Sequence, residues 1–178
     1  MLSRNNISEA NEGFFKEFDA LTELDVSFNR KLHYINDAIS ILTSLRILDV
    51  SGTAIKSFEL NHGAHPQLQH LKLNSMIRLQ ANRIHCNFHL MTALEILGIG
   101  GDCVPDPLED NFSSLTNLKE FSISGNVPCV PYTIAKSQNL CKISVLGCKN
   151  LQSPCQHIIN AGEATIIKYL QILWNSCQ

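Results

Sequence analysis

The residues of this 178-residue chain best suited to chemistry are a histidine and cysteine group and one further cysteine. His85, Cys86 and His89 stand close together and carry donor atoms of the kind that bind zinc. A structural zinc site needs four such ligands, and no second pair stands at the required spacing. Cys141 has no evident base near it in the sequence, whereas a catalytic thiol needs one to activate it. We therefore expect neither a metal site nor covalent catalysis.

A glycine cluster, formed by Gly98, Gly100 and Gly101, raises the question of phosphate binding. Phosphate-binding loops place their glycines between a strand and the start of a long helix. Here the glycines lie within an expected strand and its turn, and the chain contains no Gly-x-x-x-x-Gly-Lys-Ser/Thr loop. We interpret the cluster as a place of tight backbone packing. We expect no catalytic activity and no cofactor.

The elements that must position these residues come from a recurring pattern, Leu-x-x-(Leu/Ile/Phe)-x-(Leu/Ile/Val). Apolar and polar residues alternate within each copy, which is typical of a strand with one buried face. A period in the range of 20 to 50 residues indicates a solenoid, in which each unit buries its apolar side against its neighbours. The six copies begin at Leu21, Leu45, Leu68, Leu94, Leu118 and Leu140.

The repeated pattern resembles the leucine-rich repeat family over nearly the whole chain. The resemblance implies an α/β solenoid, with a curved parallel sheet and with short helices or 3₁₀ turns on the convex side. We expect leucine-rich repeats over residues 1–152, six of them complete, and a C-terminal helical cap over residues 153–178. Leu2, Asn5 and Ile7 match the second half of a further repeat. This truncated first repeat favours a fragment of a longer protein.

Family members usually carry an asparagine three residues after the last apolar residue of the strand. Its amide satisfies backbone groups of the turn and links one coil to the next. Met76 cannot do this, so we expect an interrupted ladder there, with water or a neighbouring residue covering the backbone. The ladder positions of this chain hold Asn29, Thr53, Met76, Asp102, Asn126 and Cys148.

Between the strands, apolar residues recur every third position, which predicts short helices or 3₁₀ turns packed onto the strand layer. Before Leu68 the corresponding positions hold His62 and His65, so we expect an irregular coil around Gly63 and Pro66. The regular triplets are Phe15, Phe18 and Leu21; Ile39, Leu42 and Leu45; Phe88, Met91 and Leu94; and Phe112, Leu115 and Leu118.

The C-terminal segment predicts two helices. Ser153 is a candidate helix cap, Pro154 suits the first helical position, and Gly162 separates a short helix from a longer one. The pattern from Leu151 to Leu170 resembles the end of intracellular repeat arrays, including those of Ras-of-complex (Roco) proteins and cytoplasmic scaffolds. The longer helix carries an apolar stripe made of Ile166, Ile167, Leu170, Leu173 and Trp174.

The amino-acid composition limits the expected cellular compartment and the expected class of binding partner. The formal net charge is −2 and no polybasic run exists, so we do not expect a nucleic-acid partner. A membrane-spanning helix needs a run of about 18 apolar residues, and the sequence contains no such run. The first residues also lack the apolar centre of a signal peptide. The seven cysteines are spread along the chain, unlike the terminal disulfide clusters of secreted family members. We therefore expect a reducing, cytoplasmic location.

The resemblance implies a module for protein–protein interaction that binds its partner through the concave face, in intracellular signalling or scaffolding. A partner with a basic patch would meet Glu23, Asp25 and Asp49, with Phe28 as an apolar anchor. The candidate partner-binding residues are Glu23, Asp25, Phe28, Arg46, Asp49, His70, Lys72, Lys119 and Glu120.

Three alternatives remain for the larger context. The C-terminal pattern favours the non-catalytic recognition arm of a multidomain enzyme, such as a Roco GTPase or kinase. The phrases LDVSGTAI and VLGCKNL resemble repeats of plant nucleotide-binding immune receptors. A free-standing adaptor is the third possibility, and the sequence does not identify the partner.

Overall fold

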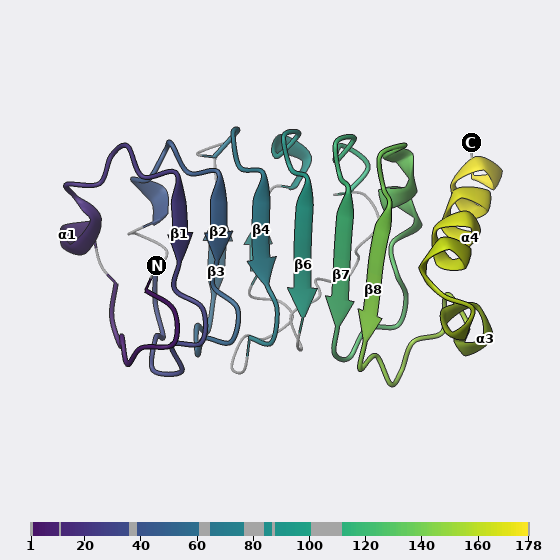
Figure 1. Ribbon diagram of the computed structural model, residues 1–178, viewed down its shortest axis with the longest axis horizontal. Coiled ribbons are helices and arrows are strands. Elements are labelled where there is room, and N and C mark those ends of the chain that lie inside the picture. Colours follow the sequence, from purple (N-terminus) through teal and green to yellow (C-terminus); the bar gives the residue numbers. More distant parts are fainter. Residues whose placement is uncertain are drawn as a thin grey trace.

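A computed structural model describes residues 2–10, 12–35, 39–60, 65–76, 84–86, 88–100 and 112–177. Within these ranges, six parallel strands lie side by side in chain order and form one sheet (Figure 1). Each strand falls on one copy of the repeated pattern, so the predicted α/β solenoid with a parallel sheet is confirmed. The strands are β1 (Glu23–Asp25), β2 (Ile47–Asp49), β4 (His70–Leu73), β6 (Ile96–Gly100), β7 (Glu120–Ser124) and β8 (Lys142–Leu146).

A column of apolar side chains runs beneath the sheet. The strands pair without a shift of register, so the middle apolar residue of each pattern faces its counterpart on the next strand. Every member of the column is buried, and each contributes roughly 1.5–3 kcal/mol by leaving water. The column consists of Leu24, Leu48, Leu71, Leu97, Phe121 and Ile143.

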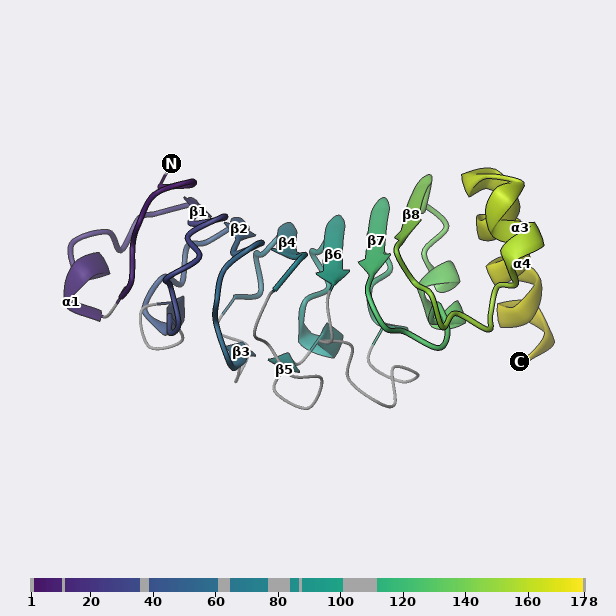
Figure 2. The same ribbon diagram turned by 90° about the horizontal axis from the view of Figure 1, so that it is seen from below.

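The return segments make the predicted tight turns. The N–H of Leu42 donates to the Ile39 carbonyl at 2.9 Å, and that of Leu45 donates to the Leu42 carbonyl at 3.1 Å. Such bonds between residues three apart define a 3₁₀ turn. The same bonds recur in the other regular triplets. In the triplet that begins at Phe88 they accompany the 3₁₀ helix η2 (Phe88–Leu90). Figure 2 shows the return segments along the side of the molecule opposite the sheet.

The first coil departs from the regular pattern. It contains a short helix, α1 (Glu12–Phe15), in which Phe15 is buried. The next member of the triplet, Phe18, is 51% exposed although it keeps its turn bond to Phe15. The backbone of Leu2 donates to Asp25 and that of Arg4 to Ser27, so the chain beside β1 continues the hydrogen-bond ladder as the partial repeat predicts.

The coil before Leu68 keeps its turn around a buried histidine. The N–H of Leu68 donates to the His65 carbonyl at 3.1 Å, and the His65 side chain is only 4% exposed. His62 and Gly63 lie outside the described residues. His65 therefore takes the place that Leu42 and Met91 hold in their coils, although neither ring nitrogen makes a hydrogen bond of normal geometry within the described chain.

A second sheet, which the sequence did not predict, lies on the return side. Strands β3 (Phe58–Leu60) and β5 (Ile84–Cys86) pair in parallel, away from the six-stranded sheet (Figure 2). Phe58 and Leu60 are buried and Glu59 is exposed, which is the alternation of a half-buried strand. Three residues are too few for such alternation to stand out from the turns expected there.

Asn29 forms the strongest link of the ladder. Its Nδ2 donates to the carbonyls of Leu2 at 2.9 Å and Val26 at 2.8 Å, and its Oδ1 accepts from the Ile7 N–H at 3.1 Å. The side chain is fully buried. It thus joins the partial first repeat to the coil of β1, as the position predicts.

The other ladder positions are weaker. Thr53 donates to the Val50 carbonyl at 2.8 Å and also lies 3.5 Å from the Met76 sulfur, and Met76 itself is buried. The Cys148 thiol lies 3.8 Å from the Ile123 carbonyl of the preceding coil. Asn126 is exposed and its Oδ1 accepts from the Asn150 amide. Asp102 lies outside the described residues.

The C-terminal segment forms α3 (Gln156–Asn160) and α4 (Glu163–Ser176), but the prediction that Ser153 is the N-cap residue of the first helix is wrong. Helix α3 begins after Cys155, two residues later than expected. Ser153 is instead drawn into a parallel bridge with Cys129, and its hydroxyl lies 3.0 Å from that of Tyr169. Gly162, at a φ of 96°, separates the two helices as predicted.

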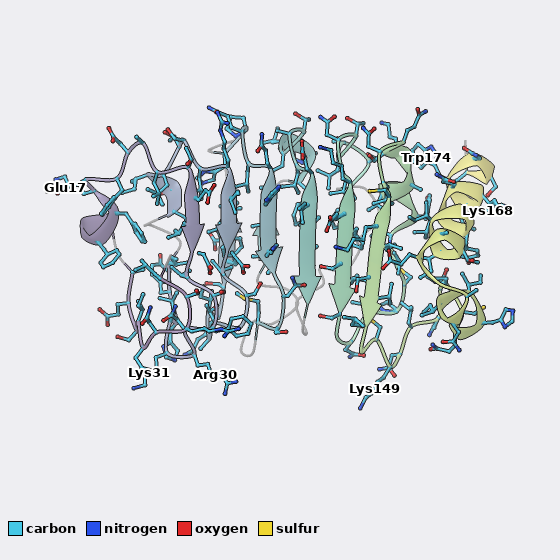
Figure 3. All side chains as sticks on the ribbon, viewed as in Figure 1. Glu17, Arg30, Lys31, Lys149, Lys168 and Trp174 are labelled. Carbon is cyan, nitrogen blue, oxygen red and sulfur yellow. The ribbon has the colours of Figure 1, made fainter. Side chains whose placement is uncertain are left out.

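The apolar stripe of α4 packs against the last coil. Ile166 and Leu170 are buried. Trp174 points from α4 towards the return segment η3 (Tyr132–Lys136), where its ring centroid lies 6.5 Å from that of Tyr132 (Figure 3). Helix α4 therefore covers the end of the apolar core next to β8 (Figure 1).

We predict that Asn29→Ala lowers the free energy of unfolding by about 1–3 kcal/mol, because it leaves buried backbone groups of two coils without partners. Urea unfolding followed by circular dichroism measures the loss. Asn126→Ala, at the exposed equivalent position, is the matched control and should change stability by less than about 0.5 kcal/mol. Equal losses in the two variants would show that burial of the ladder amide is unimportant.

We predict that His65 makes the fold sensitive to acid. Burial lowers the pKa of its imidazole, an effect that the nearby Leu42 carbonyl partly offsets. The unfolded chain takes up a proton near the ordinary pKa of about 6.5, whereas the folded chain does so only at lower pH. Below about pH 6.5 this group should therefore reduce the free energy of unfolding by up to about 1.4 kcal/mol per pH unit.

The comparison for this prediction is His65→Met, which places at this turn the residue type found in the coil of Met91. Urea unfolding at pH 7, 6 and 5 should show that the variant loses part of the wild-type pH dependence. If the two proteins respond identically to pH, His65 is not the acid-sensitive group.

Candidate functional site

The candidate site is the outward face of the six-stranded sheet, which Figure 1 views directly. The pairing of the strands arranges its side chains in two rows, each with one residue per strand. The first row is Glu23, Ile47, His70, Ile96, Glu120 and Lys142. The second row is Asp25, Asp49, Lys72, Gly98, Ser122 and Ser144.

The candidate binding residues spread along this face and its margins. Glu23, His70 and Glu120 share the first row, and Asp25, Asp49 and Lys72 share the second. Arg46 and Lys119 immediately precede β2 and β7, and Phe28 lies in the turn after β1. The structure therefore brings the three carboxylates together on β1 and β2. Strands β4 and β6 separate these carboxylates from Lys119 and Glu120.

Asp25 and Asp49 have a structural role that the sequence analysis missed. One oxygen of Asp25 accepts the Ser27 N–H at 2.9 Å, and one oxygen of Asp49 accepts the Ser51 N–H at 2.9 Å. Aspartate favours this local bond to a backbone two residues ahead. The identical phrase LDVS in both coils was the available signal. Each carboxylate is therefore fixed in place, with its second oxygen left to other partners.

Phe28 is exposed but held between two neighbours. Its φ is 57°, in the left-handed region that a phenylalanine rarely adopts. The Arg4 guanidinium lies 5.7 Å from the ring centroid, within the range of a cation–π contact. On another side, a Cβ built on Gly52 would lie 2.7 Å from the ring, so only glycine leaves room for it. Phe28 is a fixed apolar feature that remains 48% exposed.

Two candidate residues are already paired within the molecule. Lys119 lies 2.7 Å from a Glu95 oxygen, and Lys142 lies 2.9 Å from a Glu120 oxygen. The hydrogen bond to Glu120 and its negative charge raise the pKa of Lys142. Both ion pairs are exposed, so they contribute little to stability. They do, however, reduce the charge that Lys119 and Glu120 offer to another protein.

The centre of the face carries a hollow, and the glycines of β6 lie covered beside it. Gly98 and Gly100 lie under neighbouring side chains, because a Cβ on Gly98 would collide with the Asn74 amide and one on Gly100 with the Ser124 hydroxyl. The interpretation of these two glycines as tight packing is confirmed, and Gly101 lies outside the described residues. The hollow has a volume of about 240 Å³.

The histidine and cysteines that first suggested chemistry do not form a common site among the described residues. Cys86 is buried on β5, and burial raises the pKa of its thiol to about 12. His89 is exposed on η2, and the side chain of His85 lies outside the description. Cys141 is exposed with its thiol 3.5 Å from the Lys119 carbonyl. Among the described residues, no group of three His, Cys, Asp or Glu could hold a metal ion.

Within the described ranges, no helix has both the length and the apolar character needed to cross a membrane.

Comparison with known proteins supports the repeat assignment. The family profile named leucine rich repeat matches residues 1–55. The disease resistance protein RFL1 of Arabidopsis thaliana is 43% identical over 70 residues, which is 38% of this chain and 8% of that protein. A probable disease resistance protein of the same plant is 27% identical over 157 residues, or 86% of this chain and 20% of that protein. The chain spans a fifth or less of these relatives.

Among solved structures, the functional domain of InlJ from Listeria monocytogenes, described as including a cysteine ladder, resembles this fold. The two share a TM-score of 0.50 with 19% sequence identity, over 86% of this chain and 35% of the other. At this identity the likeness concerns the fold alone.

We predict that Asp49→Ala lowers the free energy of unfolding by about 0.5–1.5 kcal/mol, because the Ser51 N–H loses its acceptor. Asp49→Asn keeps an oxygen in the same place and should retain most of the stability. Thermal unfolding of both variants measures the difference. If alanine and asparagine are equally tolerated, the turn bond is not needed, and the aspartate has only an outward role.

Proposed function

We propose that this chain, which has the fold and the repeat pattern of the leucine-rich repeat family, binds another protein through the outward face of its six-stranded sheet. Domains of this family are generally non-catalytic modules for protein interaction. The binding would be non-covalent. Because the backbone hydrogen bonds fix the sheet in advance, little ordering entropy is lost on association.

The observation that carries the proposal is a cluster of three carboxylate side chains at one end of this face. Glu23 and Asp25 lie on β1 and Asp49 lies next to Asp25 on β2. Within the described chain none of the three forms an ion pair, whereas Lys119 and Lys142 are paired with glutamates on the same sheet. A cluster of uncompensated carboxylates on a rigid surface favours a partner with a basic patch.

Phe28 extends this cluster with an apolar contact. It follows β1 by a short turn and stays about half exposed, with Arg4 over its ring. Aromatic side chains that a rigid surround holds in place are common anchors at protein interfaces. We expect the partner to cover Phe28 with an apolar side chain and to place lysine or arginine over Asp25 and Asp49.

The relatives suggest the larger context. They are named disease resistance proteins, and the chain spans only a small part of each. We propose that it serves as the recognition segment of a larger immune receptor of this kind, acting in intracellular signalling. Five cysteines of the described chain carry free thiols, which favours a reducing, cytoplasmic location; they are Cys86, Cys141, Cys148, Cys155 and Cys177. The division into repeats over 1–152 and a cap over 153–178, and the likeness of that cap to Roco proteins, stay predictions.

We predict that the double variant Asp25→Asn with Asp49→Asn reduces partner capture at least about fivefold. Asparagine keeps the turn bonds while removing two charges, so the fold should be preserved. The measurement is photo-crosslinking, with a benzophenone amino acid placed at His70 on this face, in cells that express the chain natively. The crosslinked protein is identified by mass spectrometry and its yield is compared between wild type and variant.

The matched control is Glu17→Gln with Asp19→Asn, which removes two exposed carboxylates from the segment before β1. It should leave the yield unchanged. A benzophenone at Glu17 should not capture the same protein. Equal loss of capture in the two double variants would mean that net charge, and not the carboxylates on the sheet, governs the association.

A further inference from the structure

We propose that the hollow lined by Lys72, Asn74 and Lys142 binds a carboxylate side chain of the partner protein. This inference rests on the proposed function and makes it more specific, since it assigns an acidic residue of the partner to the middle of the face. Together with the carboxylates on β1 and β2, it fixes the direction in which a partner segment lies along the sheet.

The hollow lies on the outward face between β4 and β8. Gly98 stands in register between Lys72 on β4 and Ser122 on β7, but the Asn74 amide covers it, so Gly98 is buried and does not line the hollow. The space of about 240 Å³ is large enough for an aspartate or glutamate side chain. Lys72 and Asn74 line it on the β4 side, and Ser122, Ser144 and Lys142 line it on the side of β7 and β8.

Hydrogen-bond donors line the hollow. The Asn74 side chain extends over Gly98 towards a strand two positions away, where the Ser122 hydroxyl donates to its Oδ1 at 3.4 Å. That contact orients the amide so that its Nδ2 lies above Gly98. An amide N–H₂ held in this way is suited to one oxygen of a carboxylate.

The charge around the hollow favours an anion. Lys142 is neutralised by Glu120, but Lys72 forms no ion pair within the described chain. The lining therefore carries one net positive charge, from two lysines and one glutamate. A monovalent carboxylate balances that charge, with one oxygen at the Lys72 ammonium and the other at Asn74 Nδ2. A charge-assisted bond of this kind is stronger than one between neutral groups.

The experiment is a titration of the ¹⁵N-labelled chain, followed by NMR, with N-acetyl-glutamate N-methylamide as the carboxylate probe. The neutral probe N-acetyl-glutamine N-methylamide has the same shape and no charge. We expect the glutamate probe to shift the backbone resonance of Gly98 and the side-chain amide of Asn74, with weak, millimolar affinity. The glutamine probe should leave both resonances in place.

Two variants and one control locate the response. Lys72→Gln should weaken the apparent affinity about threefold, as expected for a partly exposed ion pair. Gly98→Ala places a methyl against the Asn74 amide, so it should displace this donor and abolish the shift at Asn74. The added methyl meets only the ends of two side chains, so the spectrum should still show a folded protein. Lys136→Gln, which removes an exposed lysine of η3 on the return side, should bind the probe like wild type.

An equal response to the two probes, or an unchanged affinity in Lys72→Gln, would overturn the inference. So would shifts that follow every lysine on the sheet and do not centre on Gly98. These outcomes are separable from a failure of the proposed function. A protein that is still captured at the carboxylates of β1 and β2 while the hollow ignores the probe would leave the interaction face in place and refute only its acidic contact.

Discussion

The whole structure depends on the fact that a single coil cannot bury its own apolar side. A unit of some two dozen residues has one short strand and one return segment, and its leucines find cover only in the coils on either side. The column from Leu24 to Ile143 is buried for this reason, and the hydrogen bonds from each strand to the next hold the coils at one register.

This constraint divides the chain into residues that must repeat and residues that need not. The inward positions of every strand are apolar because each one packs against two others. The outward positions meet only solvent or a partner, so the row from Asp25 to Ser144 passes from acidic to basic to small. The same division explains the glycines of β6. Gly98 lies on the outward row and Gly100 faces Ser124, and both let neighbouring side chains close over the strand without disturbing the column beneath.

The features that recur in every coil could be predicted from the sequence, whereas features that depend on a single contact between distant residues could not. The strands, the triplet turns, the role of Asn29 and the break at Gly162 all follow from local patterns that the fold repeats. The pairing of β3 with β5 was missed because it joins two three-residue strands in different coils. The helix cap at Ser153 was wrong because that residue is held by Cys129 and Tyr169, which are distant in the sequence. The outward face could be located from the pattern, but its ion pairs depend on side-chain positions that the pattern does not specify.

Register also determines which outward charges lie beside one another, and here stability and function diverge. Asp25 and Asp49 face each other on strands about 4.8 Å apart, where like charges are unfavourable. Each carboxylate accepts a backbone N–H, but an asparagine could accept the same bond without the repulsion. The negative charge is thus not needed for the turn, and no lysine or arginine of the described chain pairs with either residue. The fold does not need these two charges, which are held rigidly on an exposed face beside Phe28, and the proposed partner with a basic patch would supply the opposite charge.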